Sequence, residues 1–81
     1  MDIQVLFFAS VRDLVGEQAQ TVSVPDGATV GDLLSELAGR HPRFGEMAES
    51  LMVSVNQDYV ERDGVLTDGD EVALIPPVSG G

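Results

Sequence analysis

The C-terminal stretch of the chain decides how the rest is organised, and it reads Asp68-Gly69-Asp70-Glu71-Val72-Ala73-Leu74-Ile75-Pro76-Pro77-Val78-Ser79-Gly80-Gly81. Its first three residues form a turn sequence in which Gly69 can take a positive φ. Residues 72–75 are a continuous apolar run, which is typical of a strand with both faces buried. Pro76 and Pro77 have no backbone N–H, so strand pairing must end there. We therefore predict a final central strand, a stop, and a tail without bulky side chains that ends on a free carboxylate.

A tail of this kind can enter the active site of another protein. Six extended residues from Pro76 span roughly 20 Å at about 3.3–3.6 Å each. The two prolines stiffen the base of the tail, which lowers the entropy lost on insertion. The terminal glycines have no Cβ, so a narrow channel can admit them. The alternative is a frayed chain end, since termini are commonly disordered. We predict one domain over residues 1–75 and a flexible functional tail over residues 76–81.

The composition narrows the classes of function. Eighty-one residues form one domain, and a hydrophobic content of 43% is enough for a core. No apolar run approaches the ~18 residues of a membrane helix and no secretory leader pattern is present, so we expect a cytoplasmic protein. The net charge of −10 argues against binding to nucleic acid or membrane and favours a partner with a basic face. The same charge also aids solubility, including in a salty cytoplasm. Without cysteine, no sulfur can be carried on a side-chain thiol.

Alternating apolar residues predict the other strands. They fall at about residues 2–9, at 20–24 before the turn Pro25-Asp26-Gly27, at 51–55, and in a very short strand at Tyr59-Val60 after the turn 56–58. The first strand is apolar on both faces and the last is the most apolar, so we place these two side by side in the centre of the sheet.

Two helices and one weaker helical segment complete the prediction. Ser10 is expected to cap a short helix through Val15 that Gly16 closes. Thr29 is expected to cap the main helix, with apolar residues at helical spacing up to Ala38 and an end at Gly39 and Pro42. Residues 43–50 predict a weaker turn of helix. The fold class is therefore α+β: a mixed sheet with one main helix packed on one face.

The sheet face opposite the main helix is a candidate docking surface. If the helix covers Ile3, Val5 and Phe7, the alternate residues of the first strand point away from it. We expect four apolar residues to lie on that open face: Leu6, Phe8, Tyr59 and Ile75. Uncovered apolar residues beside a protruding tail indicate a protein-docking surface. The alternative is that loops, including residues 43–50, cover this face.

Other candidate sites have simpler explanations. Residues 27–31 precede a helix but lack the Gly-Lys-Ser/Thr of a phosphate loop. His41 has no second ligand or nucleophile nearby in the sequence, and no metal site is predicted. Asp68, Asp70 and Glu71 lack the calcium-loop pattern and are interpreted as a solvated turn. Ser10 and Ser79 have no base at a suitable spacing.

Three segments resemble one known family. The C-terminal stretch 68–81, the opening Val5-Leu-Phe-Phe-Ala-Ser-Val-Arg-Asp-Leu-Val-Gly16, and Val55-Asn56-Gln57 are similar to the small subunits of molybdopterin synthase, which are ubiquitin-like sulfur carriers. The resemblance implies a ubiquitin-like β-grasp fold and covers essentially the whole chain. It also implies that the C-terminus of Gly81 is adenylated, then thiocarboxylated, and donates sulfur for the dithiolene of molybdopterin.

The resemblance implies the partners as well. They are the large subunit of molybdopterin synthase, in a heterotetramer, an E1-like adenylating enzyme that uses ATP, and a sulfurtransferase that donates sulfur. The tail residues expected to contact them are Pro76, Pro77, Val78, Ser79 and Gly80. The chain itself binds no cofactor. It contains no acid, base or oxyanion donor set, so it is read as a sulfur-donor subunit, with the catalytic groups on the large subunit.

Besides an acidic binding domain with an idle tail, two alternatives stay open at this point. One is a sulfur carrier for another pathway, such as thiazole formation for thiamin. The other is a ubiquitin-like modifier whose Gly81 is joined to target lysines. The chain has no lysine, which forbids lysine-linked chains but leaves single conjugation possible.

Overall fold

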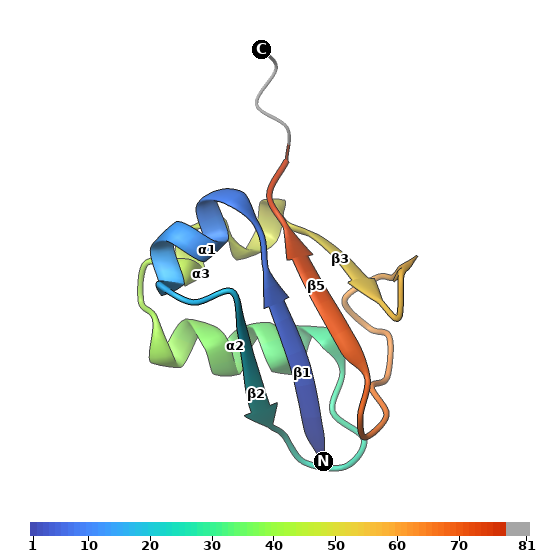
Figure 1. Cartoon of the computed structure of the whole chain (residues 1–81). Coiled ribbons are helices and arrows are strands. Elements are labelled where there is room, and N and C mark those ends of the chain that lie inside the picture. The colour runs from blue at the N-terminus through green and yellow to red at the C-terminus, as the bar shows by residue number, and fades with distance from the viewer. Residues whose placement is uncertain (78–81) are drawn as a thin grey trace.

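The structure is a computed structural model that describes residues 1–77, and Figure 1 shows a single sheet with helices on one side. Its elements in chain order are β1 Asp2–Phe7, α1 Ala9–Val15, β2 Ala19–Ser23, α2 Val30–Arg40, α3 Phe44–Met47, the 3-10 turn η1 Ala48–Ser50, β3 Met52–Val55, β4 Asp58–Tyr59 and β5 Glu71–Ile75.

The five strands are arranged in the order β2-β1-β5-β3-β4. β1 and β5 are parallel, with Val5 opposite Val72, and the other neighbours are antiparallel. The predicted mixed sheet, with the first and last strands adjacent in its interior, is confirmed. Both strands are apolar because β1 lies between β2 and β5, and β5 lies between β1 and β3.

The core lies between the sheet and the helices. Alternate residues of β1 and β5 point into it and are fully or almost fully buried: Ile3, Val5, Phe7, Val72 and Leu74. From α2 the buried side chains are Val30, Leu33, Leu34 and Leu37, which recur at helical spacing. The faces of β1 and β5 are therefore assigned as predicted.

The main helix begins as the sequence predicts and ends slightly differently. The Asp32 backbone N–H donates to Thr29 Oγ1 at 3.2 Å, and the Thr29 N–H donates to Asp32 Oδ2 at 2.9 Å, which is a complete capping box. The helix runs through Gly39 to Arg40, so the prediction that Gly39 ends it is wrong. His41 has the extended conformation that a residue before proline prefers, and Pro42 therefore decides the end.

The short helix α1 corrects another expectation. It begins at Ala9 with Phe8 at its N-cap, no side chain caps it, and Ser10 lies inside the helix. Phe8 takes this position because its N–H still donates to Leu74 O at 3.3 Å, so the chain leaves the sheet one residue before Ser10. Gly16 closes α1 in the left-handed conformation, as predicted.

Residues 43–50 lie on the helical side of the sheet. Phe44 of α3 is fully buried in the core cluster, and α3 contacts α2 and α1. Figure 1 shows α3 on the same side of the sheet as α2. The alternative in which this segment covers the open face is therefore wrong. Within residues 1–77, no helix combines the length and the apolar character needed to cross a bilayer.

Candidate functional site

The base of the tail lies in the interior of the sheet. β5 ends at Ile75 between β1 and β3, and Pro76 and Pro77 follow outside any strand. Pro76 is half-buried and Pro77 is exposed. The chain therefore leaves the domain beside the last residues of β1 and the first residue of β3. The remaining predicted tail residues, Val78, Ser79, Gly80 and Gly81, lie outside the described residues.

The four predicted docking residues share the open face. Leu6 is opposite Ala73, Ala73 is opposite Ser54, and Ser54 is opposite Tyr59, so Leu6 and Tyr59 lie in one row across the sheet. One row nearer the tail, Ile75 is opposite Met52. Phe8 lies in this row on the other side of Ile75, since it follows Phe7, the partner of Leu74. Directly opposite residues in a sheet share a face, so these side chains form one surface.

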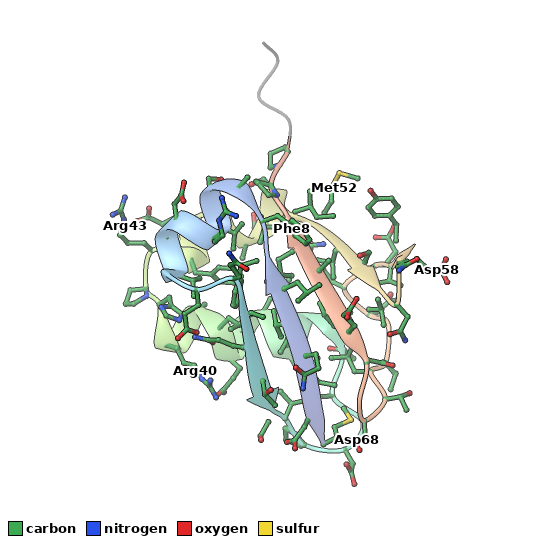
Figure 2. All side chains as sticks on the ribbon, in the orientation of Figure 1. Phe8, Arg40, Arg43, Met52, Asp58 and Asp68 are labelled. Atoms are coloured by element: carbon green, nitrogen blue, oxygen red, sulfur yellow. The ribbon has the colours of Figure 1, made fainter. Side chains whose placement is uncertain are left out.

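We name this surface the open-face patch, and its residues are Leu6, Phe8, Met52, Tyr59, Ala73 and Ile75. Phe8 is 45% exposed and Tyr59 is 67% exposed, while Leu6 and Ile75 are half-buried. Figure 2 shows Phe8 and Met52 on the two sides of the upper end of β5. The patch therefore surrounds the point from which the tail emerges.

Met52 belongs to the patch but was not predicted. It is 46% exposed, whereas Val53 beside it is buried in the core. The alternation of residues 51–55 contained this signal, because Met52 and Val53 must point to opposite faces of a strand. What the sequence lacked was the register that sets Met52 opposite Ile75.

The open face changes from apolar to polar along the strands. Away from the tail, the next row contains Thr21, Gln4 and Glu71. The Gln4 amide donates to Thr21 Oγ1 at 3.0 Å, and Ser23 Oγ donates to Asp2 Oδ1 at 2.8 Å. An apolar centre with a polar rim is the usual anatomy of a protein interface. The apolar part is the part nearest the tail.

A shallow hollow adjoins the patch on the β2 side. It has a volume of about 230 Å³ and is lined by Leu6, Phe7, Phe8, Arg12, Gln18 and Ala19. Arg12 is exposed there and is one of only four cations in the chain. The hollow can accept an apolar side chain of a partner next to Phe8, with a guanidinium at its border.

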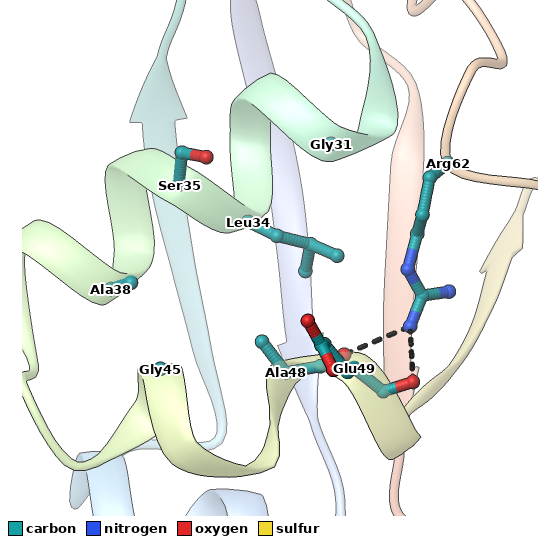
Figure 3. Close-up of a pocket in the computed structure, with 8 residues that line it drawn as sticks. All are labelled: Gly31, Leu34, Ser35, Ala38, Gly45, Ala48, Glu49 and Arg62. Atoms are coloured by element: carbon teal, nitrogen blue, oxygen red, sulfur yellow. Dashed lines mark hydrogen bonds between the residues drawn. The ribbon is translucent and has the colours of Figure 1, made fainter.

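A second hollow, of about 310 Å³, lies on the helical side and is drawn in Figure 3. Its walls come from α2, α3, η1 and Arg62, and most of the lining side chains are small: Gly31, Leu34, Ser35, Ala38, Gly45, Ala48, Glu49 and Arg62. The Arg62 guanidinium is engaged in the fold, because its Nη2 donates to Ala48 O at 2.8 Å and Leu51 O at 2.9 Å. This hollow lies on the helical side of the sheet, opposite the open-face patch, and is not part of the candidate site.

The other candidates from the sequence have structural roles. Asp68 Oδ1 accepts from the Asp2 N–H at 2.7 Å, and Asp70 accepts from the Thr67 N–H and the Asn56 amide. These acids therefore fix the turn before β5, in which Gly69 has φ +85° as predicted. At the N-terminus of α2, the Asp32 carboxylate already accepts the free N–H of Thr29. Among residues 1–77, no group of three or more metal-ligating side chains is close enough to hold a metal ion.

Comparison with known proteins assigns the sequence to a family. A sequence model of the ThiS family matches residues 5–81, which include both the patch and the tail. The chain belongs to the ThiS family. The predicted relation to molybdopterin synthase sulfur carriers is confirmed by curated relatives of that name.

Three relatives show how far the similarity of this ThiS family member extends. The Escherichia coli molybdopterin synthase sulfur carrier subunit is 48% identical, over 98% of this chain and 99% of the relative. The Chlamydomonas reinhardtii subunit of the same name is 42% identical, over 100% of both chains. Small archaeal modifier protein 3 of Haloferax volcanii is 39% identical, also over 100% of both chains.

Solved structures agree with the fold of this ThiS family member. SAMP1 from Haloferax volcanii has a TM-score of 0.87 and 34% identity, over 100% of both chains. A chain of the BexX/CysO complex of Amycolatopsis orientalis has a TM-score of 0.72 and 25% identity, over 98% of this chain and 99% of that one. Ubiquitin of Caldiarchaeum subterraneum, at 17% identity, has a TM-score of 0.66 over 100% of this chain and 98% of that one. The last likeness concerns the fold alone, and it confirms the ubiquitin-like β-grasp.

Proposed function

We propose that this chain is the sulfur carrier subunit of a molybdopterin synthase and acts in molybdenum cofactor biosynthesis. The observation that carries the proposal is the full-length similarity to sulfur carrier subunits, at 48% identity in one case, in a family match that runs to residue 81. The geometry supports it, because the central strand β5 leads into the tail through an apolar surface suited to docking.

The chemistry takes place at the terminal carboxylate. A carboxylate is a poor electrophile, so Gly81 is first activated as a mixed anhydride with AMP. A sulfide equivalent supplied by the donor protein then attacks the acyl carbon, the bond to AMP breaks as AMP leaves, and the C-terminus becomes a thiocarboxylate. A thiocarboxylate is ionised at neutral pH and is an available sulfur nucleophile. The tail presents it at high effective concentration inside the large subunit.

The folded body positions the tail and selects the partners. The open-face patch docks on the large subunit and on the E1-like adenylating enzyme in turn, while Pro76, Pro77, Val78, Ser79 and Gly80 contact the channel that Gly81 enters. A net charge of −10 favours partners with basic faces and speeds their encounter. A similar chain is part of the BexX/CysO complex, which supports a carrier that works bound to a second protein.

The partners, and not the carrier, bind the cofactor and supply the catalytic groups. The adenylating enzyme binds the ATP, the sulfurtransferase supplies the sulfur, and the large subunit supplies the catalytic groups. The carrier binds no cofactor of its own. Because it must be recharged with ATP after each transfer, the proposal is consistent with the cytoplasmic location predicted from the sequence.

The decisive experiment follows the C-terminus by mass. The purified chain is incubated with ATP, an E1-like adenylating enzyme and a sulfur donor, and its intact mass is measured. We expect the mass increase of one sulfur replacing one oxygen, located at Gly81 by fragmentation. The charged carrier should then convert cyclic pyranopterin monophosphate to molybdopterin with the large subunit.

A chain with one extra glycine after Gly81 tests the requirement for a free terminus. It should fold normally by circular dichroism but gain no sulfur, and enzymatic removal of the added residue should restore charging. A chain that is charged and active with the extra residue in place would overturn the mechanism.

The docking surface is tested by Phe8→Arg. Phe8 is 45% exposed beside the base of the tail, so a guanidinium there should weaken binding to the large subunit by about tenfold or more, as for a central interface residue. Val65→Arg is the matched control, since Val65 is 68% exposed but lies outside the patch. Equal affinities of the two variants in calorimetry would remove the assignment of the patch.

A protein modifier is the second candidate, and the similarity to small archaeal modifier protein 3 favours it. The two functions share the activated C-terminus and differ in the acceptor. Fragments of other proteins that carry the C-terminal residues of this chain on lysine would establish conjugation. Such fragments should be absent if the chain acts as a sulfur carrier alone.

A further inference from the structure

The outer edge of β2 is an open edge of the sheet. β2 is the outermost strand beside β1, and no other strand in residues 1–77 pairs with its outer side. Met1 and Val24 exchange two backbone hydrogen bonds, and the Phe7 N–H donates to Gln18 O. Since hydrogen-bonded and non-bonded pairs alternate in an antiparallel ladder, the residues whose N–H and C=O groups point outward are Ala19, Thr21 and Ser23.

This edge differs from the opposite edge of the same sheet. β4 is only two residues long, contains Asp58 and is followed closely by Glu61, so shortness and charge protect it. β2 has five residues, none of them charged or proline, and the side chains on its open face are small. Proteins usually block an edge of this kind because it can pair with another strand. The structure leaves the β2 edge available.

The charge along this edge is mixed. Arg12 lines a hollow with Gln18 and Ala19, at the start of β2. Arg40 and Arg43 lie on the β2 side of the molecule in Figure 2. Three of the four arginines are therefore on this side, although acids are present at both ends of the strand: Asp13 and Glu17 at the start, Asp2 and Asp26 at the end.

We propose that β2 is a self-association edge, at which a second copy of this chain pairs antiparallel with the first. The three outward residues are self-complementary about Thr21. Thr21 lies opposite Thr21 of the second copy, and Ala19 lies opposite its Ser23. Each of these pairs exchanges two N–H···O bonds, as hydrogen-bonded antiparallel pairs do. No charged side chain faces another within the paired strands.

The arrangement leaves the proposed sulfur-carrier site free. Directly opposite residues share a face, so the two open-face patches lie on the same side of one continuous sheet. The two-fold axis passes beside Thr21 and reverses the strand direction, so the two copies of β5 end at opposite ends of that sheet. The contact is small, and the two chains repel each other by their net charge, so the dimer is weak and is strengthened by salt.

Sedimentation velocity on the full chain tests the proposal. The protein concentration runs from about 10 µM to 1 mM, because interfaces this small are weak. Sodium chloride runs from about 0.1 M to 1 M, across which the Debye length falls from about 10 Å to 3 Å. We expect a monomer–dimer equilibrium that shifts toward the dimer with both variables.

Thr21→Lys separates this edge from other surfaces. It lowers the net negative charge and would favour non-specific association, yet it sets two ammonium groups opposite each other on the two-fold axis. We expect the dimer dissociation constant to rise by about tenfold or more. Ser35→Lys makes the same change of charge on the exposed side of α2 and should leave the dimer intact or slightly stronger.

Two outcomes would overturn the proposal. One is a monomer under every condition, and the other is a dimer that Thr21→Lys and Ser35→Lys affect equally. Sulfur charging of Gly81 is measured separately on the unsubstituted chain, so the self-association can fail while the carrier function stands.

Discussion

At the scale of single residues, Arg62 makes three non-local hydrogen bonds from one side-chain atom, more than any other side-chain atom in residues 1–77. Its Nη2 donates to three carbonyl oxygens, Ala48 at 2.8 Å, Leu51 at 2.9 Å and Glu49 at 3.3 Å. Figure 3 shows two of these bonds, to Ala48 and Glu49 of η1. The guanidinium therefore joins the loop after β4 to the segment that leads into β3. Since β3 begins with Met52, Arg62 also supports one border of the open-face patch.

Replacement of Arg62 by alanine should destabilise the domain. Three carbonyls lose their donor, and the bonds to Ala48 O and Leu51 O are partly buried, so the loss costs about 1–3 kcal/mol. The melting temperature should fall by about 4–8 °C for each kcal/mol in a domain of this size. Arg43→Ala removes the same charge from an exposed position and should melt close to the original chain. Equal melting temperatures of the two variants by circular dichroism would contradict the role of Arg62.

At the scale of elements, α2 owes its start to local chemistry and its place to the core. The Thr29–Asp32 capping box satisfies donors at the N-terminus, and the spacing of four buried residues turns one face to the sheet. Such signals lie within four residues of one another, so this helix was predicted from Thr29 onward. Its end was less accurate, because Gly39 is tolerated inside the helix and the restriction of His41 by Pro42 decides the stop.

The cap can be tested by Thr29→Ala. Loss of an N-cap side chain costs about 0.5–2 kcal/mol. We expect lower stability in urea denaturation with an unchanged slope, because the same surface is exposed on unfolding. Ser35→Ala lies in the middle of the same helix on its solvent-exposed face. Its free energy of unfolding should be unchanged or slightly higher, since alanine is the better helix former. A Thr29→Ala variant as stable as Ser35→Ala would contradict the importance of the capping box.

At the scale of the whole molecule, repulsion among the acidic side chains outweighs the attraction between opposite charges. The chain contains fourteen acidic residues and only four arginines. In residues 1–77 only two ion pairs form, Arg40 with Glu36 at 3.2 Å and the Met1 ammonium with Asp26 at 3.7 Å. The Arg40–Glu36 pair is exposed on both sides and Asp26 is fully solvated in the other pair, so both contribute little. Screening by salt therefore removes much more repulsion than attraction.

The stability of the chain should consequently rise with salt. Between about 0.01 M and 1 M sodium chloride the Debye length falls from about 30 Å to 3 Å, and we expect a steadily higher melting temperature at low protein concentration. Calorimetry at neutral pH checks this. A melting temperature that stays level or falls would show that self-repulsion does not limit the stability of this fold.

The amino-acid sequence by itself determined the features that depend on near neighbours. The turn at Gly69, the apolar run of β5, the proline stop and the capping box at Thr29 are each encoded within a few residues, because backbone conformation and caps depend on adjacent side chains. The alternation of β1 and β5 likewise assigned their buried faces. The terminal residues that carry the proposed chemistry were recognised from the same stretch.

Only the tertiary structure decided what non-local pairing brings together. It placed Met52 opposite Ile75 beside Phe8, directed Phe44 into the core and aimed Arg62 at three carbonyls. It also left the outer edge of β2 without a neighbouring strand in the part of the chain that the structure describes. Each of these depends on which strands are neighbours and in which register. The physical reason is that register follows from burying apolar surface from the whole chain at once, and no window of the sequence contains that information.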